Sequence, residues 1–564
     1  MRLSMNTQDL LYLGNCGHSL QEPQSFTLLT YGEIVAAISF LLAFIQFLRP
    51  IHRFRIQTRI KYGSIPFYLL FFLSISLIFT AKAPSLFYRI TLPYSPYFEC
   101  IAAITIPIAM GWMLWAALKP LKFKNTNRKR YFDGCAKILV SGNPSDLGEL
   151  ANEISFSSKE IVSACKNYTA NPVEEIAKAE KKESIPTYTA YALNVLNLLS
   201  DTLFCKKVVS NAPTLAVILV KEIQKQDLYE FGGSAFIRQI IKQSILNEDS
   251  ILYRETDYEG LGHYKLFTNA FFKNYAFLES KFRPMDAWEY WRDENITLWK
   301  VKKYGELLKI IFETYFETKE FNNTSSSINR GLDILTSIAR IEVNKLENYT
   351  KSTLSNSESW KILNEIASTF KGLLELAIEK SDLLLFHHYL FDNKNPENPW
   401  DVSIYKSLAR GCYTFFAALA STTKFDEEIR FASIDPWLAL YPIITKHKEI
   451  KPGYKEIQRR FEAHVFQKLQ ENLEHGLYPS ITRPILTIFH LDPELERSNK
   501  EWDKFQKQFF KYFKKNFKAA VKRFNTKALD LLPAHMKYDK KRNCIVQHHN
   551  IGRTQKTLEL KLDG

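Results

Sequence analysis

The highest density of side chains able to bind a charged ligand lies in the segment Glu501–Phe524. Its apolar residues recur every three or four positions, which predicts an amphipathic helix with one apolar stripe: Trp502, Phe505, Phe509, Phe513, Phe517, Val521 and Phe524. The rest of its surface carries basic side chains: Lys504, Lys507, Lys511, Lys514, Lys515, Lys518, Lys522 and Arg523. This basic face is open to three interpretations: a solvated face above a docked Phe stripe, a site for phosphates of nucleic acid or nucleotide, or a surface for an anionic membrane leaflet.

Two other patterns have the spacing of nuclease residues. Arg459 and His464, in a helical context, resemble the Arg-x4-6-His motif of HEPN ribonucleases. Arg483 and His490 have a similar spacing, so this pattern discriminates poorly. Asp539 and the run Glu559-Leu560-Lys561 faintly resemble a PD-(D/E)xK nuclease, whose mixed sheet flanked by helices cannot be formed by so short a tail. A membrane-tethered ribonuclease is therefore the least favoured functional hypothesis.

Other catalytic and metal-binding motifs are absent from the sequence. It has no GxxxxGK[ST] or GxGxxG phosphate loop, no HExxH zinc motif and no GxSxG nucleophile elbow. Adjacent imidazoles, as in His387-His388, point to different faces of a helix or strand and suit one metal ion poorly. The seven cysteines include no CxxC pair. We therefore predict no catalytic residue, no metal, no cofactor and no enzymatic activity.

Three apolar segments in the first part of the chain are predicted to cross a membrane. They cover residues 26–48, 65–81 and 101–118, and each has roughly the 17–25 residues that a membrane-spanning helix needs. No charged residue lies in the central part of any of them. A transmembrane domain is thus expected at 26–120, behind an N-terminal tail at 1–25.

The charges of the connecting segments predict the orientation of these helices. Between the first two segments lie Arg49, Arg53, Arg55, Arg59 and Lys61, with no acidic residue. The third segment is likewise followed by six basic residues between 119 and 130 and by no acidic one. Basic connectors stay on the cytoplasmic side. We therefore expect a multi-pass protein of the cell inner membrane, with the N-terminal tail outside and the bulk of the chain in the cytoplasm.

Small and polar residues form a seam along two of these segments. The seam has heptad spacing and consists of Gly32, Ala36, Ser39, Ala43 and Gln46 in the first segment and Ala102, Thr105 and Ala109 in the third. It serves either tight packing between helices or the lining of a pore. Since three helices of one chain cannot enclose a conduit, a pore requires a homo-oligomer in the lipid bilayer.

The rest of the chain has the periodicity of a mainly α protein. Predicted helices cover Tyr188–Val208, Thr214–Gln224, Ala287–Phe316, Gly331–Asn348, Trp360–Glu379, Ile404–Ala420 and Tyr454–Leu473. A helical cytosolic domain is expected at 121–499, followed at 500–564 by the basic helix and a tail that is strand-like around Cys544–Gln547 and Thr557–Leu562. The formal net charge of +15 is concentrated at the two ends, which favours contact with polyanions.

This layout, a transmembrane bundle before a large cytosolic domain, resembles bacterial antiphage membrane effectors, including the channel subunit of the Hailong defence system. The resemblance covers layout and charge distribution and implies a channel or membrane-permeabilising effector whose cytosolic domain binds nucleic acid or a nucleotide. The competing hypothesis is a non-conducting membrane anchor or scaffold that recruits protein or nucleic acid.

Overall fold

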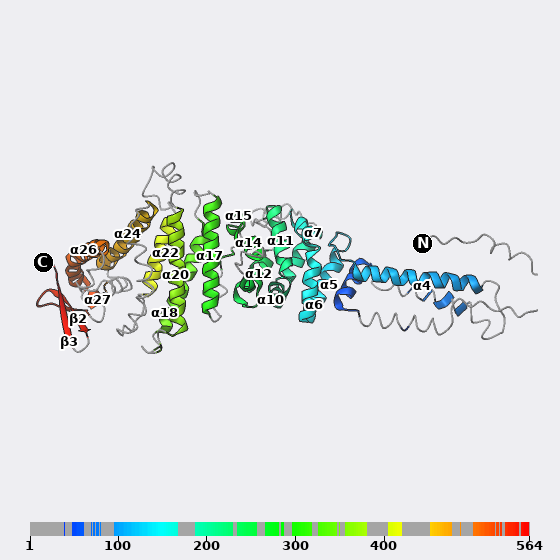
Figure 1. Cartoon of the computed structure of the whole chain (residues 1–564), viewed down its shortest axis with the longest axis horizontal. Coiled ribbons are helices and arrows are strands. Elements are labelled where there is room, and N and C mark those ends of the chain that lie inside the picture. The colour runs from blue at the N-terminus through cyan, green and yellow to red at the C-terminus, as the bar shows by residue number, and fades with distance from the viewer. Residues whose placement is uncertain are drawn as a thin grey trace, which may run out of the picture. The chain divides into compact units, whose positions relative to one another are not determined.

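The computed structural model of the chain is mainly helical, as the sequence predicts, with a small antiparallel sheet near the C-terminus (Figure 1). The chain divides into two compact units, Met1–Ile138 and Leu139–Gly564. Apart from isolated positions, the structure describes residues 48–60, 95–166, 187–228, 234–255, 265–280, 296–318, 325–346, 356–380, 404–419, 452–475, 500–524, 526–529, 536–551 and 554–562.

The N-terminal unit contains two helices that pack on each other, α2 (Pro50–Arg59) and α4 (Ser95–Leu118). Proline at the start of α2 suits the first turn, where its fixed φ matches the helix and an N–H would lack an intrahelical partner. A buried apolar cluster joins the two helices and consists of Leu48, Ile56, Met113, Ala116 and Ala117. Ile75 packs against this cluster, so the second predicted membrane segment contributes to the same core.

Helix α5 (Arg128–Ser141) is joined to α2 through aromatic rings. Phe54 meets Tyr131 edge to face at 5.4 Å, and Tyr131 meets Phe123 in the same way at 5.3 Å. Such edge-to-face pairs are favourable because the positive ring edge meets the negative ring face. Tyr131 of α5 therefore packs against both α2 and the loop after α4.

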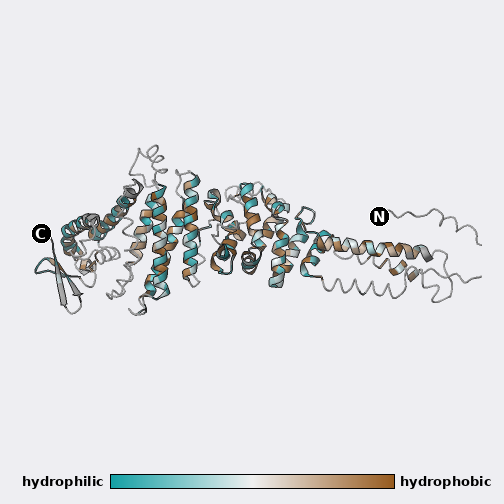
Figure 2. Cartoon of the chain, viewed as in Figure 1, coloured by the Kyte–Doolittle hydropathy of each residue, from teal (hydrophilic) through white to brown (hydrophobic). Residues whose placement is uncertain are grey.

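Helix α4 is long and apolar enough to cross a membrane over Cys100–Leu118, and 28% of that stretch is buried. Figure 2 shows hydrophobic residues along its length, and the exposed large ones are Ile101, Ile104, Ile108, Trp112, Leu114, Trp115 and Leu118. The other two predicted spans, 26–48 and 65–81, lie mostly outside the described residues, as does the tail 1–25. The three-helix membrane domain therefore stays a prediction.

The second unit begins with a group of short helices: α6 (Pro144–Ser155), α7 (Ser158–Cys165), α9 (Thr187–Leu198), α10 (Thr202–Asn211), α11 (Pro213–Lys225), α12 (Ser234–Leu246), α13 (Ile251–Arg254), α14 (Leu266–Phe272) and α15 (Tyr275–Leu278). The single helix predicted over Tyr188–Val208 is wrong. The side chain of Asp201 accepts a hydrogen bond from the N–H of Phe204 at 2.8 Å, and this cap starts α10 as a separate helix.

Helices α10 and α11 together are also apolar enough for a membrane span, but they bend by 99° at the break between them. Pro213 opens α11, where it cannot continue the preceding helix. Val208 and Leu219 are fully buried, and the two helices contact α6 and α12. This pair is therefore part of the core of the second unit.

Longer helices follow: α17 (Leu298–Thr318), α18 (Ser326–Leu346), α20 (Glu358–Glu379), α22 (Ile404–Leu419) and α24 (Pro452–His475). Helix α17 contacts α20, α18 contacts α22, and α22 contacts α24, so the helices stand side by side (Figure 1). Close approach of α17 and α20 depends on Gly305, where an added Cβ would lie 2.3 Å from Oγ1 of Thr369. The bounds agree with the predicted helices to within a few residues, except at 287–295, which lie outside the described residues.

The C-terminal region contains α26 (Lys500–Phe524), α27 (Thr526–Leu529) and three strands, β1 (Met536–Asp539), β2 (Cys544–Ile551) and β3 (Thr554–Lys561). The strands form one antiparallel sheet in the order β1-β2-β3. Arg542 forms an ion pair with Glu559 at 2.8 Å and approaches Asp539 at 3.7 Å. The two carboxylates of the nuclease-like pattern thus bind an arginine on an antiparallel sheet, which is not the mixed sheet of that nuclease fold.

Candidate functional site

The apolar stripe of α26 is turned into the protein. Phe509, Phe513 and Phe517 are fully buried, and their rings follow one another at 6.2 Å and 4.8 Å between centroids. Phe517 continues the row to Tyr538 of β1 at 5.9 Å. The side chains of Trp502 and Phe505 lie outside the described residues. The central part of the stripe is thus packed inside the protein, so these three rings are not available for insertion into a bilayer.

The lysines of α26 gather on the opposite side of the helix. At 100° per residue, positions 504, 507, 511, 514, 515, 518 and 522 fall within a sector of about 100°, roughly opposite the buried phenylalanines. Lys507, Lys511, Lys515 and Lys522 are exposed, and Lys514 and Lys518 are partly exposed. The side chain of Lys504 lies outside the described residues. We call this basic sector the lysine face.

The positive charge of the lysine face is not neutralised by the residues that the structure describes. None of the six lysines from Lys507 to Lys522 forms an ion pair within the part of the chain that the structure describes. Arg523 lies outside the sector, donates a hydrogen bond to the carbonyl of Glu474 at 3.2 Å and joins α26 to α24. Consecutive lysines four residues apart are separated by about 6 Å along the axis, so a strand of phosphates can contact several of them.

A second group of basic residues, which the sequence analysis missed, lies between α22 and α24. It consists of Lys406, Arg410, Arg460, His464 and Lys468. The imidazole of His464 stacks on the ring of Tyr413 at 5.9 Å. Burial lowers the pKa of His464, and the four neighbouring cations lower it further. The sequence could have indicated this group, because the basic residues of each helix are four positions apart and therefore lie on one face of that helix.

The nuclease-like pair Arg459 and His464 is not brought together by α24. Five residues correspond to about 140° around a helix, so the two side chains leave it on different faces. Arg459 is exposed, whereas His464 is partly buried against Tyr413. Arg460, which is only about 40° from His464, lies on its face. The structure therefore places Arg460, and not Arg459, beside His464.

Basic side chains of α2 bind the C-terminal carbonyls of α4. Arg55 donates to Ala117 and Leu118 at 3.0 and 2.8 Å, and His52 Nδ1 lies 3.0 Å from the same Ala117 oxygen. Arg59 reaches four more carbonyls, those of Trp115, Ala116, Lys119 and Pro120, at 2.5 to 3.1 Å. The last carbonyls of a helix have no intrahelical partner and carry negative partial charge, so cations stabilise them. We call Arg55, Arg59 and His52 the arginine clamp.

An aromatic ring lies beside the arginine clamp. The guanidinium of Arg59 is 5.1 Å from the centre of the Trp115 ring, and the ammonium of Lys119 is 5.0 Å from it. Cations at this distance from an indole are attracted by the negative ring face. Tryptophan and basic residues together are typical of the interface between a membrane and water.

The seam residues of α4 face into the N-terminal unit. Ala102 is fully buried, Ala109 is 5% exposed, and the Thr105 hydroxyl donates to the Ala102 carbonyl at 3.1 Å. This placement favours helix packing over pore lining for the third segment. In the first segment, Ser39 is exposed, and Gly32, Ala36, Ala43 and Gln46 lie outside the described residues.

Metal-binding groups are not found among the residues that the structure describes, because no three His, Cys, Asp or Glu side chains come together there. Five described cysteines are buried as free thiols, and burial raises the pKa of Cys165 to about 12. Such a thiol is protonated and unreactive at neutral pH. No protein-family model, curated protein or solved structure matches this chain.

Proposed function

We propose that this chain is a multi-pass protein of the cell inner membrane that forms an oligomeric channel or permeabilising pore. Its helical region would lie in the cytoplasm and bind nucleic acid or a nucleotide, and binding there would control the pore. One observation supports this proposal most: α4 exposes large apolar side chains along its length and ends in the arginine clamp. A helix with an apolar surface suits the hydrocarbon core of a membrane, and basic side chains at its C-terminal end suit the cytoplasmic face.

The position of the clamp supports the orientation that we propose for the chain in the membrane. Arg55 and Arg59 bind the carbonyl end of α4, and positive residues are retained on the cytoplasmic side. The second unit follows α4 in the chain and would therefore be cytoplasmic, with the tail 1–25 outside. The exposed lysine face of α26 would then meet soluble polyanions.

The direct test of the pore is ion flux through proteoliposomes, measured with and without short single-stranded oligonucleotides. We expect flux that changes when the oligonucleotide is present on the side of the second unit. Replacing Ser39, Ala43 and Gln46 with Leu tests the seam of the first segment, since unchanged conductance would remove these residues from the pore. Absence of flux in both conditions, from folded and inserted protein, would refute the channel.

A non-conducting membrane anchor is the second candidate, and one observation favours it. The small residues of α4 are buried within a single chain, and its Thr105 hydroxyl already has an acceptor, so this helix offers no evident wet lining. The oligomeric state in detergent discriminates between the two proposals. A monomer would favour the anchor, because one chain with three spans cannot surround a conduit.

A role in antiphage defence, which the resemblance in layout implies, belongs to the same proposal. We expect phages to form fewer plaques on cells that express the chain than on cells that express a variant lacking the lysine face. Equal plaque counts for both would argue against the defence role and leave the membrane function to be judged by flux.

A further inference from the structure

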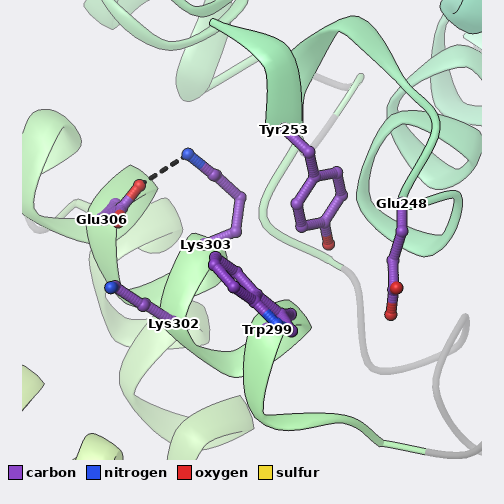
Figure 3. Close-up of a pocket in the computed structure, with 6 residues that line it drawn as sticks. All are labelled: Glu248, Tyr253, Trp299, Lys302, Lys303 and Glu306. Carbon is purple, nitrogen blue, oxygen red and sulfur yellow. Dashed lines mark hydrogen bonds and ion pairs between the residues drawn. The ribbon is translucent and has the colours of Figure 1, made fainter. Parts of the chain in front are cut away.

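A pocket lined by two aromatic and four charged side chains lies in the second unit, away from α26. Its volume is about 250 Å³, and its lining consists of Glu248, Tyr253, Trp299, Lys302, Lys303 and Glu306 (Figure 3). The residues come from the turn before α13, from α13 itself and from the first three turns of α17. Pockets for drug-sized ligands measure about 300–1,000 Å³, so this pocket suits a smaller group.

The indole of Trp299 is the unusual feature of the pocket. This side chain is 64% exposed, although tryptophan is normally well buried. Figure 3 shows Tyr253 and Glu248 on one side of the indole and Lys302 on the other. The ammonium of Lys302 is 5.6 Å from the ring centre. An exposed indole next to a cation is a favourable platform for a planar ring attached to an anionic group.

Internal hydrogen bonds hold the other walls of the pocket in place. The Tyr253 hydroxyl donates to the Ile245 carbonyl at 2.5 Å, and the Tyr253 ring lines the pocket. The Thr297 hydroxyl donates to Glu248 at 3.1 Å, and Lys303 pairs with Glu306 at 2.7 Å. Glu248 has a second carboxylate oxygen and further lone pairs, so it can still accept hydrogen bonds from a ligand. The site is thus largely formed before a ligand arrives.

The charges of the pocket narrow the class of ligand. Two carboxylates and two ammonium groups give no net charge, so a simple anion or a simple cation gains little overall attraction. A nucleotide can interact with both kinds of charged side chain. An exocyclic amine of its base can donate to a carboxylate, and its phosphate can bind an ammonium group. Adenine, cytosine and guanine carry such an amine, whereas the N3–H donor of thymine and uracil lies between two carbonyl oxygens. A carbonyl oxygen of thymine facing Glu248 would be repelled.

We propose that this pocket binds one nucleotide with an amino-bearing base, which stacks on Trp299, donates to Glu248 and places its phosphate near Lys302. The proposal deepens the proposed function, because it rests on a nucleic acid or nucleotide ligand and names the part of that ligand that is recognised. The nucleotide is either free or one unit of an oligonucleotide. The lysine face of α26 would add affinity without regard to the base, whereas the pocket would select the base.

The test measures binding of labelled single-stranded oligonucleotides to the full chain in detergent. We expect oligo-dC, oligo-dA or oligo-dG to bind more tightly than oligo-dT. Trp299→Ala should weaken that binding by about 5- to 150-fold, the loss expected for one stacked base, and Trp299→Phe should retain most of it. Glu248→Gln should abolish the preference over oligo-dT, since an amide can also donate to a carbonyl. Leu203→Ala is the matched control, because Leu203 is a similarly exposed apolar side chain, at 60%, outside the pocket.

Competition with free mononucleotides distinguishes the two sources of the ligand. Displacement of the oligonucleotide by the matching monophosphate at micromolar concentration would identify a free-nucleotide site, and displacement only by oligonucleotides would identify a unit of a strand. Oligo-dT binding as tightly as the others, or Trp299→Ala behaving like Leu203→Ala, would overturn the inference. Such a result with intact salt-dependent binding to α26 would leave the proposed function standing. If only substitutions in the lysine face of α26 reduced oligonucleotide binding, and no base were preferred, the pocket inference would likewise be overturned and the proposed function would stand.

Discussion

Removing charge from the lysine face of α26 should weaken polyanion binding without affecting the fold. The variant replaces four exposed lysines with glutamine: Lys507, Lys511, Lys515 and Lys522. None of these side chains packs into the core, because the buried stripe of Phe509, Phe513 and Phe517 leaves the helix on the opposite side. The variant should therefore unfold at the same temperature as the parent protein.

The magnitude follows from the number of phosphates that the four lysines can neutralise. For single-stranded nucleic acid, each neutralised phosphate contributes about 0.7 to the slope of log affinity against log salt. Four contacts then contribute about 2.8, and a fourfold rise in salt would change the affinity ratio between parent and variant by about 50-fold. The spacing of about 6 Å between successive lysines of a row allows each to reach its own phosphate.

The assay is fluorescence anisotropy of a labelled oligonucleotide at several salt concentrations. A matched control removes the same charge elsewhere on the second unit, from four other exposed lysines: Lys221, Lys225, Lys361 and Lys371. We expect the control to keep the parent slope and the α26 variant to lose most of it. If both variants lose the same small amount, net charge alone attracts the polyanion, and the reasoning about the lysine face is refuted.

Three further predictions concern stability. Gly305→Ala should be less stable than Gly372→Ala by about 1–3 kcal/mol in chemical denaturation. The methyl group added at Gly305 meets Thr369, whereas the one added at Gly372 meets only the flexible side chain of Lys309. Equal stabilities would contradict the close approach of α17 and α20 at Gly305. Arg59→Gln should lower the melting temperature in detergent, and Arg59→Lys should not restore it, because an ammonium cannot reach four carbonyls together. The lowered pKa of His464 means that the unfolded chain binds this proton more tightly, so stability should fall as pH drops through about 6.5, less so in His464→Phe.

The spacing of apolar residues along the sequence predicted much of the helical structure. The stripe in α26 predicted its helix but left open what the stripe contacts, and the structure buries Phe509, Phe513 and Phe517 within the protein. Helices α18, α20, α22 and α24 were likewise predicted, since apolar residues every three or four positions are read along one short segment. Asp201 shows the limit of this reading, because a single capping side chain divided a continuous apolar pattern into two helices.

Only the tertiary structure brings together the residues that form each site. The arginine clamp joins side chains to carbonyls that are 56 to 65 residues apart in the chain, and the pocket joins Glu248 to the first turn of α17 through Thr297, 49 residues away. A sequence pattern reports which residues share a face of one helix, whereas the neighbour of that face depends on how side-chain volumes fit between helices distant in sequence. The basic residues of α2 were therefore visible as charge in the sequence, and packing placed Arg55 and Arg59 on the C-terminal carbonyls of α4.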